Sequence, residues 1–135
     1  MGDRSIRILI IDDYEPWRRF VSATLQKQPN FQIIGDAADG LEAVQQAQEL
    51  QPDLILLDIG LPTLNGIEAA RRIHQVCPDA KILFASQNHD PGIVEAALSN
   101  GARGYFLKGD GKTELLRAIE TVLRGDKFIS SRLKA

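Results

Sequence analysis

Short aliphatic runs alternate along this chain with segments whose apolar residues recur at helical spacing. The predicted strands cover residues 6–11, 31–37, 54–57, 81–85 and 104–107, and the predicted helices cover about 15–25, 40–50, 67–76, 93–98 and 113–123. The run at 54–57 contains only aliphatic residues, which is typical of a strand covered on both faces. Alternation of five strands with five helices therefore predicts an α/β fold, with a parallel sheet between two layers of helices.

Length and composition narrow the class of protein. The chain has 135 residues, of which 44% are hydrophobic and 25% charged, so we expect one globular domain. The formal net charge of -2 gives no overall basic field for nucleic acid. One cysteine, Cys77, excludes an internal disulfide, and neither a signal peptide nor an apolar stretch of membrane-spanning length is evident. We expect a cytoplasmic domain that binds neither membrane nor nucleic acid directly.

Four of the predicted strands end in polar side chains. They are Asp12 and Asp13 after the first strand, then Asp58, Ser86 and Lys108. Parallel strands bring these ends to one edge of the sheet, where open α/β sheets bind their ligands. Taken singly, each aspartate could cap a helix or turn, the serine could be a turn hydroxyl, and the lysine could be solvated. The joint pattern is much harder to obtain by accident than any one of its members.

The residue types at this edge are suited to phosphoryl chemistry. Three crowded carboxylates repel one another and need a cation, and hard oxygen ligands favour Mg²⁺. A hydroxyl and an ammonium on the other side suit phosphate oxygens, while one carboxylate acts as the nucleophile. The sequence contains no phosphate-binding Gly-x-x-x-x-Gly-Lys loop, no nucleophile elbow and no Gly-x-Gly-x-x-Gly fingerprint.

These segments resemble the CheY-like receiver domain of bacterial two-component response regulators, over about residues 5–128. The amino-acid sequence from Asp58 to Pro62 and from Gly66 to Ala70 resembles the NarL/FixJ group in particular. The segments that carry the resemblance are Ile10–Asp13, Leu56–Pro62, Asn65–Gly66, Ser86 and Gly101–Lys108.

The resemblance implies a role for each residue of the edge. Asp58 would accept a phosphoryl group from a sensor histidine kinase. Asp13 and Asp58 would bind Mg²⁺ directly, together with the backbone carbonyl of Gly60, and Asp12 would act mainly through water. Lys108 would pair with the phosphoryl oxygens. Two further residues form the implied switch, in which Ser86 moves to the phosphoryl group and the rotamer of Tyr105 follows.

The resemblance also implies the fold and the biological setting. The fold would be a doubly wound, flavodoxin-like three-layer sandwich with a five-stranded sheet of order 2-1-3-4-5. Residues 1–128 would form the receiver domain, and residues 129–135 would begin a linker to an absent LuxR-type DNA-binding output domain. Such a chain is a phosphoacceptor switch rather than an enzyme, although it catalyses its own phosphotransfer and dephosphorylation. A homodimer formed on phosphorylation would use the surface at 91–107, and an interface on the first and last helices is the main alternative.

Two positions depart from the commoner family pattern. Ser86 replaces the more frequent threonine and keeps the hydroxyl. Gln87 stands where many members have a small residue, so its longer side chain is expected to narrow access to Asp58.

Three alternatives remain at this stage. The chain could be a stand-alone receiver that acts through protein–protein contacts, or a pseudo-receiver that only binds partners. It could also be a Mg²⁺-dependent aspartyl phosphatase of the haloacid-dehalogenase type. That class needs a second aspartate two residues after the nucleophile, where this chain has Gly60.

Overall fold

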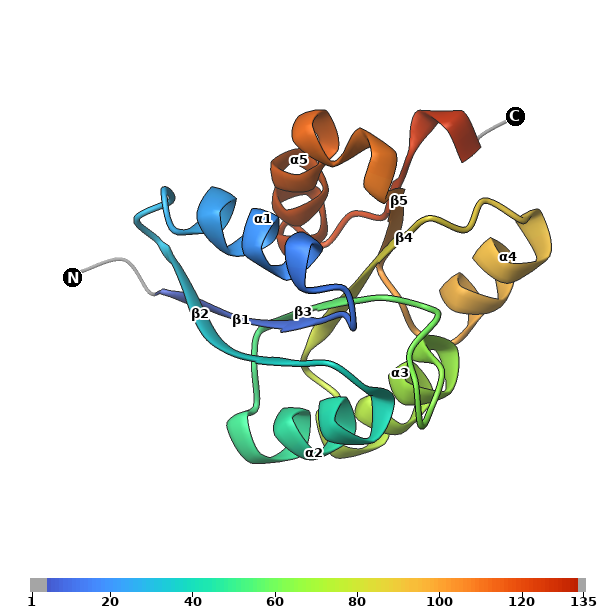
Figure 1. Ribbon diagram of the computed structural model, residues 1–135, viewed down its shortest axis with the longest axis horizontal. Coiled ribbons are helices and arrows are strands. Elements are labelled where there is room, and N and C mark those ends of the chain that lie inside the picture. Colours follow the sequence, from blue (N-terminus) through green and yellow to red (C-terminus); the bar gives the residue numbers. More distant parts are fainter. Residues whose placement is uncertain (1–4, 134–135) are drawn as a thin grey trace.

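The fold is one parallel β-sheet with helices on both faces (Figure 1). The computed structural model describes residues 5–133. The strands are β1 (Ile6–Ile11), β2 (Phe31–Ala37), β3 (Leu54–Leu57), β4 (Lys81–Ser86), β5 (Gly104–Leu107) and β6 (Phe128–Ile129). The α-helices are α1 (Glu15–Leu25), α2 (Gly40–Leu50), α3 (Gly66–Val76), α4 (Pro91–Ser99) and α5 (Gly111–Leu123). Short 3₁₀ helices, η1 (Lys108–Asp110) and η2 (Ser131–Leu133), complete the described chain.

The strand order is β2-β1-β3-β4-β5-β6, and every paired strand is parallel to its neighbour. The predicted α/β class and the predicted order of the first five strands are confirmed. None of the helices between residues 5 and 133 has the length and hydropathy needed to cross a lipid bilayer.

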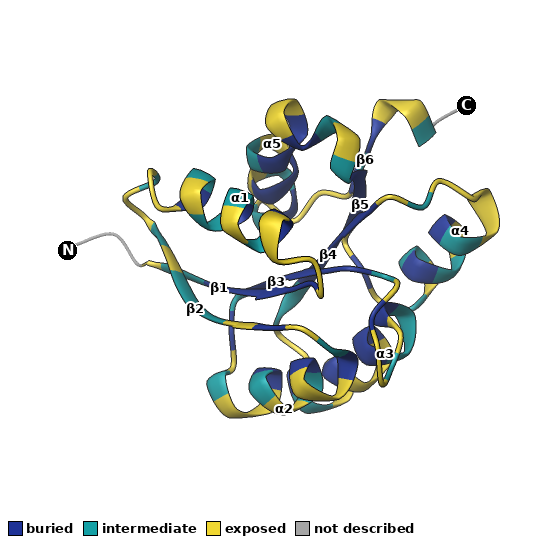
Figure 2. Cartoon of the chain, in the orientation of Figure 1, coloured by how far each residue is buried: buried dark blue, intermediate teal, exposed yellow. Residues whose placement is uncertain are grey.

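A separate apolar core lies on each face of the sheet. Helices α1 and α5 cover one face, and α2, α3 and α4 cover the other (Figure 1). The inner strands are buried on both faces, whereas the helices expose their outer sides (Figure 2). This double burial explains why the sequence of β3 is aliphatic without alternation, since neither face of that strand meets water.

The sheet has one strand more than predicted. Phe128 and Ile129 form β6, which pairs with Gly104 and Tyr105 of β5. Of residues 129–135, expected to begin a linker, the described residues 129–133 pack on the domain through buried Ser130 and partly buried Leu133. Residues 134 and 135 lie outside the described part of the chain. The amide of Ser130 continues the pairing by donating to the carbonyl of Tyr105 at 3.1 Å. A run of two residues is too short to show the alternation of a strand in the sequence. The strand forms because β5 offers an unpaired edge to which these residues can hydrogen-bond.

Candidate functional site

The carboxyl ends of four adjacent strands bring the predicted site residues together. Asp12 follows β1, Asp58 follows β3, Ser86 ends β4 and Lys108 follows β5. The register aligns these ends, because Ile11 is level with Leu57, and Leu57 with Phe84. The site thus lies on rigid strand ends rather than on a mobile loop.

Three carboxylates form the acidic part of the site. Asp12, Asp13 and Asp58 each offer one oxygen within 4.8 Å of the others. Asp12 is 1% exposed and Asp58 is 9% exposed, whereas Asp13 faces solvent. One oxygen of each buried carboxylate is fixed by a backbone amide: Asp12 accepts from Tyr14 at 2.9 Å, and Asp58 accepts from Ile59 at 2.8 Å. The second oxygen of each remains directed to the shared site.

A single ammonium faces this group from the neighbouring strand end. The Nζ atom of Lys108 lies 2.6 Å from Oδ2 of Asp12 and 3.5 Å from Oδ2 of Asp58. The lysine side chain is only 10% exposed, so water screens these contacts weakly. A guanidinium also adjoins the site, because Arg18 donates to the backbone carbonyl of Asp12 at 2.5 Å. These two cations of the described chain still leave the three carboxylates with excess negative charge.

Burial and crowding disfavour the ionised form of Asp58. Loss of solvent raises the pKa of this carboxyl first of all, and the negative charge of Asp12 raises it further. Lys108 and the amide of Ile59 lower the pKa of Asp58, but they do not cancel the rise. A carboxylate in this state is poised to gain from a cation or from conversion to an ester.

An open cavity of about 220 Å³ adjoins Asp58. It is lined by Asp58, Ile59, Gly60, Ser86, Gln87, Asn88 and Lys108. The cavity gives a donor group direct access to the Asp58 carboxylate. Gln87 is exposed at its wall, so the predicted narrowing by this side chain does not close the approach.

Ser86 and Tyr105 lie next to one another across β4 and β5. The Tyr105 hydroxyl is buried and donates to the carbonyl of Asn88 at 2.5 Å. The hydroxyl oxygen of Ser86 accepts the amide of the same residue, Asn88, at 3.0 Å. Burial raises the pKa of Tyr105, which keeps this hydroxyl protonated as a donor. A movement of Ser86 would therefore disturb Asn88, whose carbonyl holds the Tyr105 hydroxyl inward.

The loop after β3 is shaped by a close approach of two backbone segments. A side chain at Gly66 would place its Cβ atom 1.9 Å from the carbonyl oxygen of Asp58, so only glycine fits. Asn65 caps α3 by accepting from the amide of Glu68 at 3.0 Å. The Asn-Gly pair thus fixes the start of α3 directly behind Asp58, which is a physical reason for these residues at this spacing.

The sequence did not reveal three polar or aromatic contributors. Ser130 is fully buried: its hydroxyl donates to Glu114 at 2.5 Å and accepts the amide of Leu107, the residue before Lys108, at 3.0 Å. Trp17, a buried residue of α1, lies beside Lys108. No local pattern marks these contacts, because each joins residues from different elements.

Fold and site together define a class: an open parallel α/β domain with an acidic cluster and a lysine at the carboxyl edge of its sheet. Comparison with known families agrees with this class. The family described as "Response regulator receiver domain" matches residues 8–120. The chain belongs to this family and is a receiver domain of a two-component response regulator.

Individual relatives give the same answer. The chain is 36% identical over 133 residues to the transcriptional regulatory protein DegU of Brevibacillus brevis, covering 98% of this chain and 56% of that protein. It is 37% identical over 128 residues to the transcriptional regulatory protein LiaR of Bacillus subtilis, covering 95% and 61%. The chain thus spans less than two thirds of the length of these relatives.

A solved structure extends the likeness to three dimensions. A LuxR-family two-component response regulator from Aurantimonas sp. SI85-9A1 superposes with a TM-score of 0.90 at 32% identity, covering 96% of this chain and 92% of that one. The response regulator domain of Thermotoga maritima CheB has a TM-score of 0.76 at 35% identity, covering 90% and 93%. The resemblance to a CheY-like fold is therefore confirmed.

Proposed function

We propose that this domain is a phosphorylation-activated switch in which Asp58 accepts a phosphoryl group from a phosphohistidine on a sensor histidine kinase. One observation carries the proposal: a buried carboxylate stands beside an open cavity, with Lys108 3.5 Å from its oxygen. Phosphorylation would add negative charge to this site, and the ammonium of Lys108 is placed to meet part of that charge.

The chemical step is an exchange of one bond to phosphorus for another. An Oδ atom of Asp58 attacks the phosphorus, the phosphorus–nitrogen bond breaks, and the donor imidazole leaves with the bonding electrons. Lys108, now paired with Asp12 and Asp58, supplies positive charge to the phosphoryl oxygens. The amide of Ile59 holds the other oxygen of Asp58 and fixes the direction of attack.

The donor set fits Mg²⁺. Three carboxylates within 4.8 Å offer only oxygen atoms, and one ammonium does not balance them. Asp13 and Asp58 would hold the ion with the carbonyl of Gly60, and Asp12 would reach it mainly through water. Bound there, Mg²⁺ would neutralise excess charge and bind phosphoryl oxygens.

The switch step is carried by Ser86 and Tyr105. A phosphoryl group on Asp58 would draw the hydroxyl of Ser86 away from the amide of Asn88, and the carbonyl of Asn88 is the group that holds Tyr105. A change of state needs such a contact in one state and not in the other. The surface at 91–107 would then change its association with a second copy. Because β6 pairs with β5, we now expect α4, rather than the edge of β5, to provide that contact.

The output is also part of the proposal. The relatives DegU and LiaR are named transcriptional regulatory proteins, and this chain spans only part of their length. We therefore propose a cytoplasmic switch that controls a LuxR-type DNA-binding domain following residues 129–135. A stand-alone receiver is the alternative. An aspartyl phosphatase is disfavoured, because Gly60 offers no side chain to act as its general acid.

Phosphorylation of intact protein by acetyl phosphate with Mg²⁺ tests the acceptor. Wild type should gain the mass of one phosphoryl group, and Asp58→Asn should gain none. Asp53→Asn is the matched control, since Asp53 lies at the opposite end of β3. A phosphoryl adduct on Asp58→Asn, or equal loss in both variants, would refute Asp58 as the acceptor.

A further inference from the structure

We propose that Trp17 is a positioning residue that holds Lys108 in place for phosphoryl transfer. Trp17 belongs to α1, far in sequence from Lys108, yet Nζ of Lys108 lies 5.5 Å from the centroid of the indole ring. That distance is within the range at which an ammonium is attracted to the negative face of an aromatic ring. The inference rests on the proposed function, because it assigns a role within that reaction.

The ring acts as one of three partners of the ammonium. Lys108 contacts Oδ2 of Asp12 at 2.6 Å and Oδ2 of Asp58 at 3.5 Å, and the indole adds an uncharged support. A phosphoryl group on Asp58 must draw Nζ partly away from Asp12. An aromatic face can stay in contact during this movement, because its attraction has no single directional bond. Trp17 would thus limit the conformations that the long side chain of Lys108 can adopt.

The ring itself is held from several sides. Its centroid lies 5.3 Å from that of Phe20 and 6.2 Å from that of Phe106, and the side chain is buried in the core between α1, α5 and the sheet. Gly111 at the start of α5 packs directly on it: an added Cβ there would lie 2.9 Å from Cη2 of the indole. The backbone at Gly111, three residues after Lys108, therefore packs against the edge of the ring.

Removal of the aromatic face should slow transfer without destroying the site. A cation–aromatic contact is stronger when it is desolvated, and only part of its strength applies to the transition state. We expect Trp17→Leu to lower the rate of Asp58 phosphorylation about fivefold. Trp17→Phe keeps an aromatic face and should recover most of the rate.

The first experiment reads the contact itself, with neither Mg²⁺ nor a phosphodonor present. Trp17 is the one tryptophan in the sequence, so its fluorescence reports this position alone. A nearby ammonium quenches indole emission, and Lys108→Met should therefore raise the intensity and lengthen the lifetime. Lys112→Met is the control, because Lys112 lines the same groove but is exposed. Unchanged emission in Lys108→Met, or an equal rise in both variants, would overturn the proposal.

The second experiment compares the rates of phosphorylation by acetyl phosphate at saturating Mg²⁺. The variants are Trp17→Leu, Trp17→Phe and Phe20→Leu, each with its urea unfolding curve. Phe20→Leu loses an aromatic neighbour of the indole but no contact with Lys108 that the structure gives. A slow Trp17→Leu with near-normal Trp17→Phe and Phe20→Leu supports the proposal.

Other outcomes separate the inference from the proposed function. A normal rate in Trp17→Leu overturns the positioning role, as does slowing that follows stability equally in Trp17→Leu and Phe20→Leu. If wild type takes up no phosphoryl group, the proposed function fails, and the fluorescence arm alone then supports or overturns the contact between Trp17 and Lys108.

Discussion

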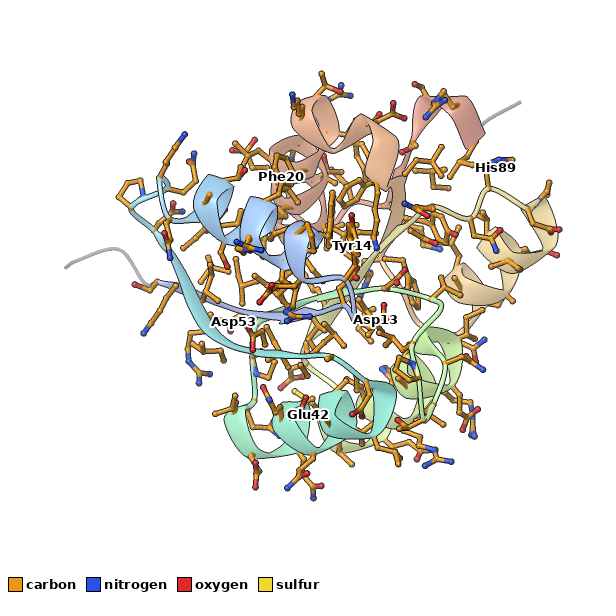
Figure 3. The ribbon with its side chains drawn as sticks, in the orientation of Figure 1. Asp13, Tyr14, Phe20, Glu42, Asp53 and His89 are labelled. Carbon is orange, nitrogen blue, oxygen red and sulfur yellow. The ribbon has the colours of Figure 1, made fainter. Side chains whose placement is uncertain are left out.

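Charged residues at the two ends of the strands differ in what they contact. At the amino edge they bind backbone groups, and at the carboxyl edge they face one another. At the amino edge, the guanidinium of Arg7 donates to the carbonyls of Gln51 and Leu50 at 2.7 and 2.8 Å, and so satisfies the end of α2. Asp53 at the same edge accepts the backbone amide of Arg7 at 2.8 Å. At the carboxyl edge, Lys108 pairs with Asp12 and Asp58, and Asp13 completes the cluster of carboxylates (Figure 3, in which Asp13 and Asp53 mark the two edges).

This contrast separates structural charges from functional ones. The amino edge uses each charge to satisfy a backbone group, which adds stability. The carboxyl edge gathers like charges under burial, which costs stability and is useful only if a ligand meets them. Substitutions should therefore have opposite signs at the two edges, and the predictions below run from the largest expected effect to the smallest.

Arg7→Met should destabilise the domain by about 2 kcal/mol, because two carbonyls at the end of α2 lose a charged donor. Urea unfolding of the variant and wild type measures the difference. Arg19→Met is the control, since Arg19 makes only an exposed pair with Glu15 in the described contacts. Equal stability of Arg7→Met and wild type would show that the hydrogen bonds of Arg7 at the amino edge do not stabilise the domain.

Asp13→Asn should weaken Mg²⁺ binding about tenfold, which is about 1.4 kcal/mol, because it removes a charged ligand from the acidic cluster. Titration with Mg²⁺, followed by the fluorescence of Trp17, measures the affinity. Asp53→Asn at the opposite edge should bind Mg²⁺ as wild type does. Unchanged affinity in Asp13→Asn would show that this residue is not a ligand.

Gly60→Asn should speed loss of the phosphoryl group about tenfold, which is about 1.4 kcal/mol of barrier. Gly60 has no side chain to hold a water in line with the phosphorus, and Asn88, on the other side of the cavity, is a neutral amide and a poor base. The structure leaves room for the change: an added Cβ at Gly60 meets nothing within 4 Å, and Gly60 is not among the residues with positive φ. Decay after removal of the donor is the measurement, and equal or slower decay would contradict it.

Asp58→Asn should stabilise the domain by about 1 kcal/mol at neutral pH with the metal chelated. The pKa of Asp58 is raised in the folded state, so its ionised form destabilises the fold at pH values above that pKa. The gain should vanish as pH falls through the raised pKa, because wild type then takes up a proton. Urea unfolding of both proteins across pH tests this prediction. If the stability advantage of Asp58→Asn grew on acidification, the pKa of Asp58 would be lowered rather than raised in the folded state.

The sequence by itself determined the strands, the helices and the composition of the acidic edge. A strand buried on both faces needs an unbroken aliphatic run, so the sequence predicts β3 at its observed bounds. Parallel strands place their carboxyl ends at one edge of the sheet. The sequence alone therefore predicts that Asp12, Asp58 and Lys108 lie close together. Their roles as acceptor, ligand and cation remain predictions.

Tertiary structure alone decided the contacts that depend on packing between elements. The strand β6 exists because β5 offers an unpaired edge, and two residues carry no period that could announce it. The buried pair of Ser130 and Glu114 joins the last strand to α5. The indole of Trp17 reaches Lys108 because α1 packs on the sheet against Phe106, near the carboxyl end of β5. Local sequence sets backbone preference and burial, but the distance between side chains remote in sequence is set by how the layers pack.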